Sequence, residues 1–231
     1  MAESSIAPVT SSLLPKELFG LTPERRIVGR NLSKADVLLY RVRGRRIAVK
    51  DYGARPFLAR HTVGRLLTGR ECRAYERAGT VPGLASFLGR LGPFTLATAW
   101  LDAIPLPDLP RGAASPVLFD RLDAVIAGLH LRGVAMSDLH HRDVLVAEDG
   151  GVHVVDLAMA YVLGPRPGWF RRRLFERLSA QDRLSAARMR ARFTGRSEND
   201  ALAELDSATR RRWRAGRRIK GLWDRLRGKR A

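Results

Sequence analysis

Three aspartates flank one predicted β-hairpin in the second half of the sequence. Asp138 and Asp143 precede the apolar run 144–146, and Asp156 follows the run 152–155. A Glu-Asp-Gly-Gly turn joins the two runs, so the three carboxylates are expected at the rims of a short hairpin. Clustered carboxylates suit a site that binds Mg²⁺ and a phosphate donor. The alternative is that these residues only cap backbone groups, as turn-adjacent Asp often does.

Lys50 is the other residue whose position suggests chemistry. It closes the strand-like run RRIAVK, next to apolar Ala48 and Val49, where a lysine needs a partner. Glu71, on the following helical segment, is a candidate for that partner. In the alternative interpretation, Lys50 is an ordinary surface lysine with a buried stem and Glu71 is a solvated helix residue.

The elements that must position these residues follow from the apolar pattern. The helical segment that carries Glu71 contains Gly64 and Gly69, which are expected to weaken or split it. In chain order, the expected elements are strands over 36–42 and 45–52 joined by a tight Arg43-Gly44 turn, a helix over 58–78, two strands and a Pro-rich connector within 85–109, an amphipathic helix over 116–134, the hairpin, and a basic helical segment over 169–193.

Length, cysteine usage and the apolar segments limit the kind of protein that this sequence can be. A chain of 231 residues can bury a full core as one domain or as two small lobes. One cysteine, Cys72, excludes an intrachain disulfide and fits a reducing compartment. The N-terminus has no basic start followed by an apolar run, and no apolar stretch is long enough to cross a bilayer. We therefore expect a cytoplasmic protein, or one bound peripherally to the inner face of the cytoplasmic membrane.

Five features follow one another along the chain: IAVK at 47–50, Glu71 in GRECRAYERAG, the connector after Trp100, SDLHHRDVLV at 137–146 and VVDLAMA at 154–160. In this order they resemble the protein-kinase-like fold, nearest to the bacterial lipopolysaccharide kinase group (the Kdo and heptose kinases), with the RIO kinases as relatives. The resemblance implies an α+β fold of two lobes, a small β-rich N-lobe and a mostly helical C-lobe. We expect a lead-in over 1–26, the ATP-binding N-lobe over 27–103, the C-lobe with the catalytic loop and metal site over 104–207, and a basic helix over 208–231.

The same resemblance implies the role of each site residue. Lys50 would contact the phosphates of ATP and Glu71 would hold Lys50. Asp138 would be the catalytic base or substrate-orienting acid, and Asp143 and Asp156 would bind Mg²⁺. ATP and Mg²⁺ are thus the expected cofactors.

The tripeptide His141-Arg142-Asp143 suggests a different register, with Asp143 as the base. The metal ligand would then fall on Glu148, inside the turn, where nothing holds it rigidly. With Asp138 as the base, the metal ligand five positions later is Asp143, directly before a strand. We therefore assign the catalytic role to Asp138.

The sequence departs from the family pattern in three places. The glycine-rich loop is reduced to Gly29, so the Asn31–Lys34 turn is expected to cover the phosphates. Asp143 replaces the usual Asn, and the tripeptide Asp-Leu-Ala at 156–158 replaces Asp-Phe-Gly.

No Ala-Pro-Glu tripeptide follows Asp156, and the chain continues almost directly into the basic helical segment. A small or lipid-linked acceptor is therefore favoured over an extended peptide. We predict a kinase that phosphorylates a hydroxyl of an envelope saccharide such as the lipopolysaccharide core. The alternatives are a RIO-like serine/threonine protein kinase and a nucleotide-binding pseudokinase.

Positive charge is concentrated near the C-terminus. Residues 166–231 contain 21 Lys and Arg against 7 Asp and Glu, within a net charge of +19. On a helix over 208–231, Trp223 and Leu226 fall on an apolar stripe with most arginines outside it. Such a helix suits an anionic membrane surface; docking on the C-lobe is the equal alternative, and binding to nucleic acid is the weaker one.

Overall fold

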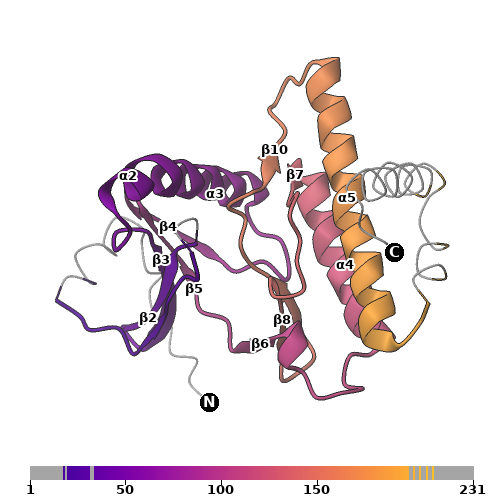
Figure 1. The fold of residues 1–231 in the computed structure, drawn as a ribbon, viewed down its shortest axis with the longest axis horizontal. Coiled ribbons are helices and arrows are strands. Elements are labelled where there is room, and N and C mark those ends of the chain that lie inside the picture. The colour runs from indigo at the N-terminus through magenta and orange to yellow at the C-terminus, as the bar shows by residue number, and fades with distance from the viewer. Residues whose placement is uncertain are drawn as a thin grey trace, which may run out of the picture.

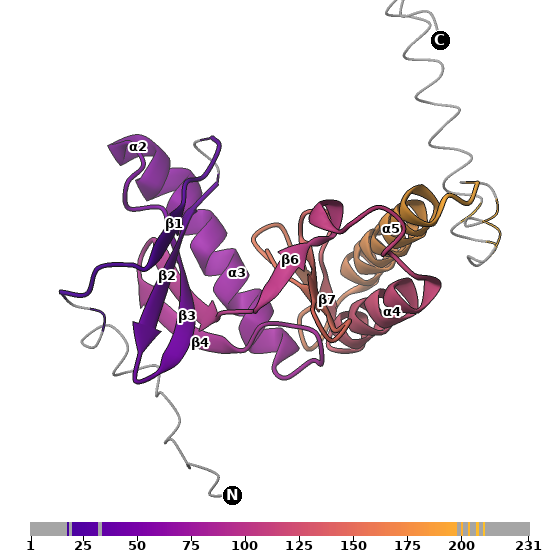
Figure 2. The same cartoon turned by 90° about the horizontal axis from the view of Figure 1, so that it is seen from below.

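The computed structural model describes residues 18, 20–31, 34–197, 200, 203, 207 and 210. These residues form two lobes, a β-rich N-terminal lobe and a C-terminal lobe built around two long helices (Figures 1 and 2). This is the two-lobed α+β architecture expected from the sequence. The basic helix expected over 208–231 lies outside the described residues, apart from Arg210.

The N-lobe is built on one antiparallel sheet of five strands in the order β1-β2-β3-β5-β4. Its strands are β1 (Arg25–Ile27), β2 (Asp36–Val42), β3 (Arg45–Asp51), β4 (Phe87–Gly92) and β5 (Thr95–Ala99). Ile47 and Val49 of β3 are buried on one face, so the strand alternation turns Lys50 to the other. The turn between β2 and β3 has positive φ at both Arg43 and Gly44, as the tightest hairpin turns require.

β1 was not anticipated from the sequence. Its three residues are all exposed, and it is held by pairing with β2, where Arg25 lies opposite Leu39. It begins within the segment expected to be a lead-in. A strand without buried residues has no apolar alternation, so it leaves no pattern to read.

The expected helix over 58–78 forms in three parts: α2 (Phe57–Ala59), a π-helical turn η1 (Arg60–Gly64) and α3 (Arg65–Ala78). The irregularity coincides with Gly64. A Cβ added there would lie 2.8 Å from the Cβ of Tyr52, so only glycine lets the helix approach the end of β3 this closely. Glu71 lies in α3 and is fully buried.

The chain passes between the lobes at residues 100–102, because β5 ends at Ala99 and the next strand already pairs with the C-lobe. The C-lobe contains β6 (Ala103–Pro105), η2 (Leu106–Asp108), α4 (Pro116–Leu131), β7 (Val134–Ala135), β8 (Val144–Ala147), β9 (Val152–Val154), β10 (Tyr161–Val162) and α5 (Trp169–Thr194). Ser115 caps α4 by accepting a hydrogen bond from the backbone N–H of Leu118. The largest core cluster lies here, with α4 contributing Phe119, Leu122, Ile126 and Leu129 at helical spacing.

Two short strand pairings tie the middle of the C-lobe together. β8 and β9 form the expected hairpin, and β7 pairs antiparallel with β10. The chain from 136 to 160 is therefore a loop closed at its base by β7–β10 and braced inside by β8–β9. All three predicted aspartates lie in this loop. Across the described part of the chain, no helix combines the length and the apolar character needed to cross a bilayer.

Candidate active site

A pocket of about 180 Å³ lies between the lobes and collects most of the predicted site residues. Both lobes contribute walls. The lining residues are Lys34, Tyr52 and Leu67 from the N-lobe, and Asp138, Asp143, Asp156, Ala158 and Met159 from the C-lobe. The three aspartates thus share one cavity, although 18 positions separate the first from the last.

Lys50 and Glu71 form an ion pair at the back of this region. Lys50 Nζ lies 2.6 Å from Glu71 Oε1 and 3.3 Å from Asp156 Oδ1. The backbone N–H of Leu157 also donates to Glu71 Oε1, at 3.3 Å. Burial alone would favour the neutral amine, but Glu71 and Asp156 raise the pKa of Lys50 well above its usual value. Lys50 is therefore a fixed cation; its role toward a nucleotide stays a prediction.

Asp156, in the C-lobe, forms ion pairs with two lysines of the N-lobe. Besides Lys50, it accepts a hydrogen bond from Lys34 Nζ at 3.0 Å and from the backbone N–H of Ala158 at 3.3 Å. The positive charge of Lys50, followed by that of Lys34, lowers the pKa of Asp156. Its φ of +70° is in the left-handed region, which a non-glycine residue adopts only when its surroundings hold it there.

Asp143 lies at the start of β8, at the same end of the hairpin as Asp156. Its carboxylate accepts a hydrogen bond from the backbone N–H of His140 (3.1 Å), and its carbonyl accepts one from Val155 (2.9 Å). Burial, followed by the negative charge of Asp156, raises the pKa of Asp143 to about 7. Glu148 lies in the turn at the opposite end of the hairpin and does not line the pocket. The register with Asp138 and Asp143 is thus the one that places both carboxylates at the cavity.

Asp138 differs from the other two aspartates because it is exposed. Among the described residues, no hydrogen-bond or ion-pair partner holds its carboxylate, which lines the pocket. An exposed carboxylate at the rim of a cavity is accessible to a second substrate. Its role as a base or an acceptor-orienting acid stays a prediction.

Asp182 of α5, which was not singled out from the sequence, anchors the segment before Asp138. It is fully buried, and its two oxygens accept hydrogen bonds from the backbone N–H groups of Met136 and Ser137, both at 2.8 Å. His130 of α4 lies 2.9 Å from Oδ2. Ser137 has a φ of +69°, so Asp182 stabilises a strained backbone directly beside the candidate catalytic residue.

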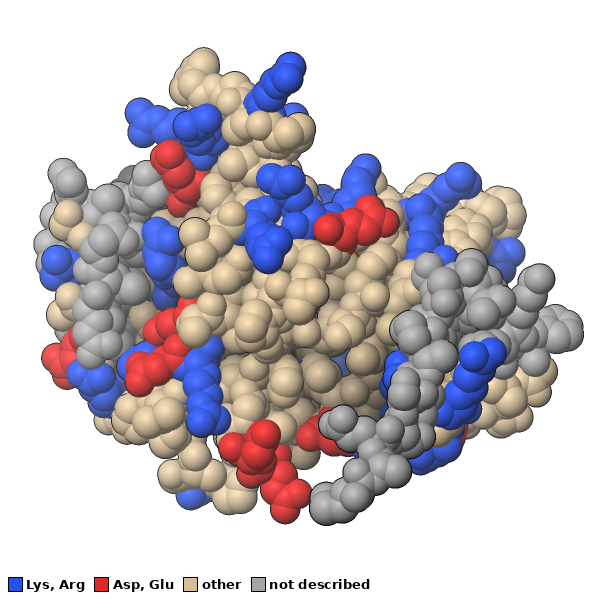
Figure 3. All heavy atoms as spheres, turned by 180° about the vertical axis from the view of Figure 1, so that it is seen from behind, with Lys and Arg blue, Asp and Glu red and all other residues tan. Residues whose placement is uncertain are grey.

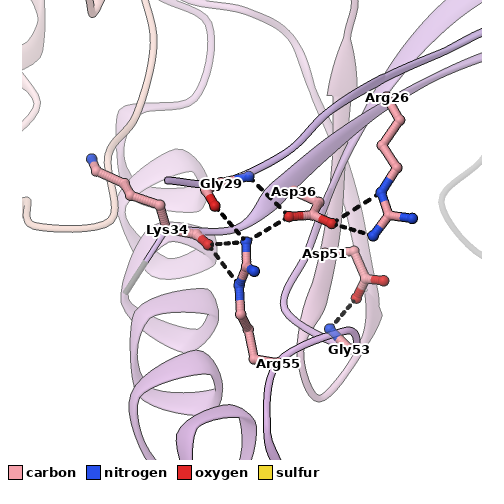
Figure 4. A network of polar contacts seen from close by, with 7 residues as sticks. All are labelled: Arg26, Gly29, Lys34, Asp36, Asp51, Gly53 and Arg55. Carbon is pink, nitrogen blue, oxygen red and sulfur yellow. Dashed lines mark hydrogen bonds and ion pairs between the residues drawn. The ribbon is translucent and has the colours of Figure 1, made fainter. Parts of the chain in front are cut away.

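Asp36 and Arg55 hold the backbone at Gly29 and Lys34, beside the turn that is expected to cover the phosphates (Figure 4). Arg55 Nη2 donates to Asp36 Oδ1 at 2.5 Å and to the carbonyls of Gly29 and Lys34, at 3.2 and 2.9 Å. The backbone N–H of Gly29 donates to Asp36 Oδ1 at 2.9 Å. A Cβ at Gly29 would lie 2.4 Å from the Lys34 carbonyl oxygen. The network therefore fixes the backbone at Lys34, from which the side chain reaches Asp156.

The donor set suits a metal ion that is bound together with a nucleotide. Within the part of the chain that the structure describes, no group of three His, Cys, Asp or Glu residues could hold a metal ion alone. Asp143 and Asp156 nevertheless line one pocket. Mg²⁺ in phosphate-transfer sites takes one or two carboxylates and completes its shell with phosphates and water. Two aspartates beside two lysines fit that requirement.

The arrangement of the lobes, with the pocket between them, defines a kinase-like fold. No family model matches the sequence, and no curated protein matches it either. Among solved structures, the fold is similar to the crystal structure of the Rio2 kinase–ADP/Mg²⁺–phosphoaspartate complex from Chaetomium thermophilum, with a TM-score of 0.58 and 16% sequence identity. The match covers 86% of this chain and 66% of that one, so the chain spans slightly less than two thirds of that kinase. The likeness establishes the fold; the finer resemblance to lipopolysaccharide kinases stays a prediction.

Proposed function

We propose that this protein is a phosphotransferase that moves the terminal phosphoryl group of ATP to an alcohol hydroxyl. The observation that carries the proposal is the charge arrangement of one pocket: Asp138, Asp143 and Asp156 line it, and Lys50 reaches Asp156 from the opposite lobe. The similar Rio2 kinase structure is a complex with ADP and Mg²⁺. Clustered acids opposite fixed cations are what a phosphate donor and its metal ion require.

Each residue has a distinct part in this proposal. Lys50, held by Glu71, binds donor phosphates, and Asp143 and Asp156 hold Mg²⁺, which when bound neutralises charge on the phosphates. Asp138 orients the acceptor hydroxyl and accepts its proton. Lys34, which lines the same pocket, contacts the phosphates as well.

For the acceptor we propose a saccharide or lipid-linked saccharide of the cell envelope, such as the lipopolysaccharide core. Support comes from the segment between Asp156 and α5, residues 157–168, which is short and contains β10 paired with β7. Such a segment offers no extended platform for a peptide. The basic C-terminal region would hold the protein on the inner face of the cytoplasmic membrane.

Two other functions are each favoured by one observation. Similarity to the Rio2 kinase favours a RIO-like serine/threonine protein kinase. The raised pKa of Asp143 favours a pseudokinase that binds nucleotide without turnover.

ATP consumption should be measured in parallel with extracted lipopolysaccharide and with a generic protein acceptor. Turnover stimulated by lipopolysaccharide alone is the expected result. Stimulation by protein alone would establish the protein kinase instead. ATP binding without turnover in either assay would establish the pseudokinase.

A further inference from the structure

A second cavity, of about 590 Å³, lies beside the candidate active site. It is formed where α3 meets the segment around β10 and the first turn of α5, whose projecting end is visible in Figure 1. Three arginines line it: Arg70 and Arg73 from α3, and Arg171 from α5. No acidic residue is among its lining residues, so the cavity is strongly positive.

Within the described residues, none of these three arginines has a carboxylate partner. Arg70 Nη2 donates to the carbonyls of Met159 (3.1 Å) and Ala160 (3.4 Å), and Arg171 Nε lies 3.5 Å from the Tyr161 hydroxyl. Within the described ranges, neither these two nor Arg73 forms an ion pair.

Arg190, lower on α5, shows the contrast, because it pairs with both Asp120 and Asp123. Three guanidinium groups around one cavity repel one another, and each retains free N–H donors. Figure 3 shows Lys and Arg side chains around the projecting end of the molecule, at the upper left. An anionic ligand in the cavity would satisfy these donors and relieve the repulsion.

The chemistry of the lining selects among anions. Arginine binds phosphate with two parallel hydrogen bonds, a geometry that lysine does not offer. Leu66 and Tyr161 add an apolar and an aromatic surface beside the charges. A phosphate attached to a carbon framework matches this combination better than a bare inorganic ion.

The cavity and the candidate active site share a wall. Ala158 and Met159 line the active-site pocket, and Ala160 and Tyr161 line the arginine cavity. Even a fully extended chain spans at most about 10 Å between Ala158 and Tyr161. The two cavities are therefore bordered by neighbouring residues of one short segment.

We propose that this arginine cavity binds a phosphate group already present on the acceptor, so that the enzyme acts on a phosphorylated saccharide. This proposal rests on the proposed function, because it assigns the acceptor to the neighbouring pocket. Arg73 and Arg171 hold the phosphate from opposite helices. Arg70 completes the site while bracing the backbone after Asp156.

Titration calorimetry on the full chain tests the site without turnover, with inorganic pyrophosphate as the first probe. The pocket variant is Arg73→Gln/Arg171→Gln, which spares the bracing residue Arg70. The matched control is Arg65→Gln/Arg172→Gln, which removes the same charge from the same two helices at exposed positions outside the cavity. Lys50→Ala reports pyrophosphate bound at the candidate active site instead.

The pocket variant should lose at least about tenfold in pyrophosphate affinity, while the matched control stays within about twofold of the unmodified chain. Equal losses in the pocket variant and its matched control, or a loss confined to Lys50→Ala, would overturn the site.

The source of the phosphate is tested with glucose 1-phosphate, glucose and phosphatidylglycerol vesicles. Binding of glucose 1-phosphate but not glucose, weakened in the pocket variant, is expected. If the pocket variant loses only vesicle binding, the ligand is a lipid headgroup and the acceptor assignment is wrong. Absence of turnover with every acceptor would instead contradict the proposed function and leave the measured anion site intact.

Discussion

Asp182 of α5 accepts a hydrogen bond from the backbone N–H of Ser137, 45 positions earlier, at 2.8 Å. The accepting Asp182 is fully buried, and the hydrogen bond fixes Ser137, directly before Asp138, in a left-handed conformation. The C-lobe helix thereby determines where the candidate catalytic carboxylate points.

Asp182→Ala should destabilise the protein by on the order of 3 kcal/mol, because it leaves the N–H groups of Met136 and Ser137 without their acceptor. As a comparison, Asp120→Ala removes an exposed acid that pairs with Arg190 of α5. This change should lower the free energy of unfolding by less than about 1 kcal/mol. Denaturant unfolding of both variants measures the difference. Equal losses would mean that Asp182 does not anchor the loop.

Asp138→Asn should reduce phosphoryl transfer by about 10²- to 10⁴-fold and leave the dissociation constant for ATP nearly unchanged, because this carboxylate is proposed to contact the acceptor and not ATP. Asp156→Asn should instead weaken the binding of Mg²⁺–ATP, since Asp156 contacts Lys34 and Lys50, the two lysines proposed to bind phosphate. Single-turnover kinetics and nucleotide titration separate the two effects. The assigned register is wrong if Asp143→Ala abolishes transfer through the acceptor while Asp138→Asn is harmless.

Lys50 and Glu71 should behave as one functional unit. Each single change to Ala should raise the ATP concentration needed for half-maximal rate. The free-energy loss of the double variant should be smaller than the sum of the two single losses, by about 1–3 kcal/mol. The reason is that, in the proposed mechanism, Glu71 acts on ATP only through Lys50, its partner at 2.6 Å. Additive losses would show two independent residues, and melting curves check that Glu71→Ala is folded.

Mg²⁺–ATP should bind more tightly as the pH rises through about 7, because burial and Asp156 raise the pKa of Asp143 to about 7 and only the ionised form coordinates a cation. Asp143→Asn should weaken binding at high pH and flatten this profile. Titration of Mg²⁺–ATP between about pH 6 and about pH 8 measures both effects.

The same pKa affects stability with the opposite sign. In buffer without Mg²⁺, folded Asp143 holds its proton to a higher pH than the unfolded chain does. The contribution of Asp143 to the free energy of unfolding is therefore present at low pH and lost as the pH rises through about 7. The stability difference between Asp143→Asn and the unmodified protein should widen in favour of the variant over that range, and a constant difference would contradict the raised pKa.

Deletion of residues 208–231 should leave ATP turnover intact and remove binding to anionic vesicles. Residues 209–231 carry 11 Lys and Arg against one acid, and each such charge near an anionic leaflet contributes about 1 kcal/mol. Co-sedimentation of both forms with vesicles, beside a melting curve of each, tests this. A lower melting temperature of the truncated form without a change in vesicle binding would favour docking on the C-lobe.

The parts of the fold that were predictable are those encoded by local patterns. The alternation around Lys50 and the turn between the two runs of the hairpin specify β3, β8 and β9 without reference to the rest of the chain. The helix over 58–78 was also recognisable, and Gly64 marked the place where it becomes irregular.

The contacts that sequence reasoning missed act over long separations. The turn that ends at Lys34 was expected near the phosphates, but its contact with Asp156, 122 positions away, leaves no pattern in the neighbouring sequence. Asp182 did leave a signal, because it shares the spacing of the buried residues Ser179, Ala186 and Met189 on one face of α5. An acid on a buried helix face requires partners, but which backbone groups these are depends on the tertiary fold.

The charged residues of the candidate site are divided between the lobes, and the closed loop formed by residues 136–160 carries the three aspartates. Its two strand pairings hold the three aspartates at fixed positions relative to one another, whereas Lys34 and Lys50 belong to the other lobe. Any hinge motion between the lobes therefore separates cations from anions. The Coulomb attraction across the gap acts as a restoring force that salt weakens. Under the proposed function, a polyanionic nucleotide would compete with Asp156 for the same two lysines.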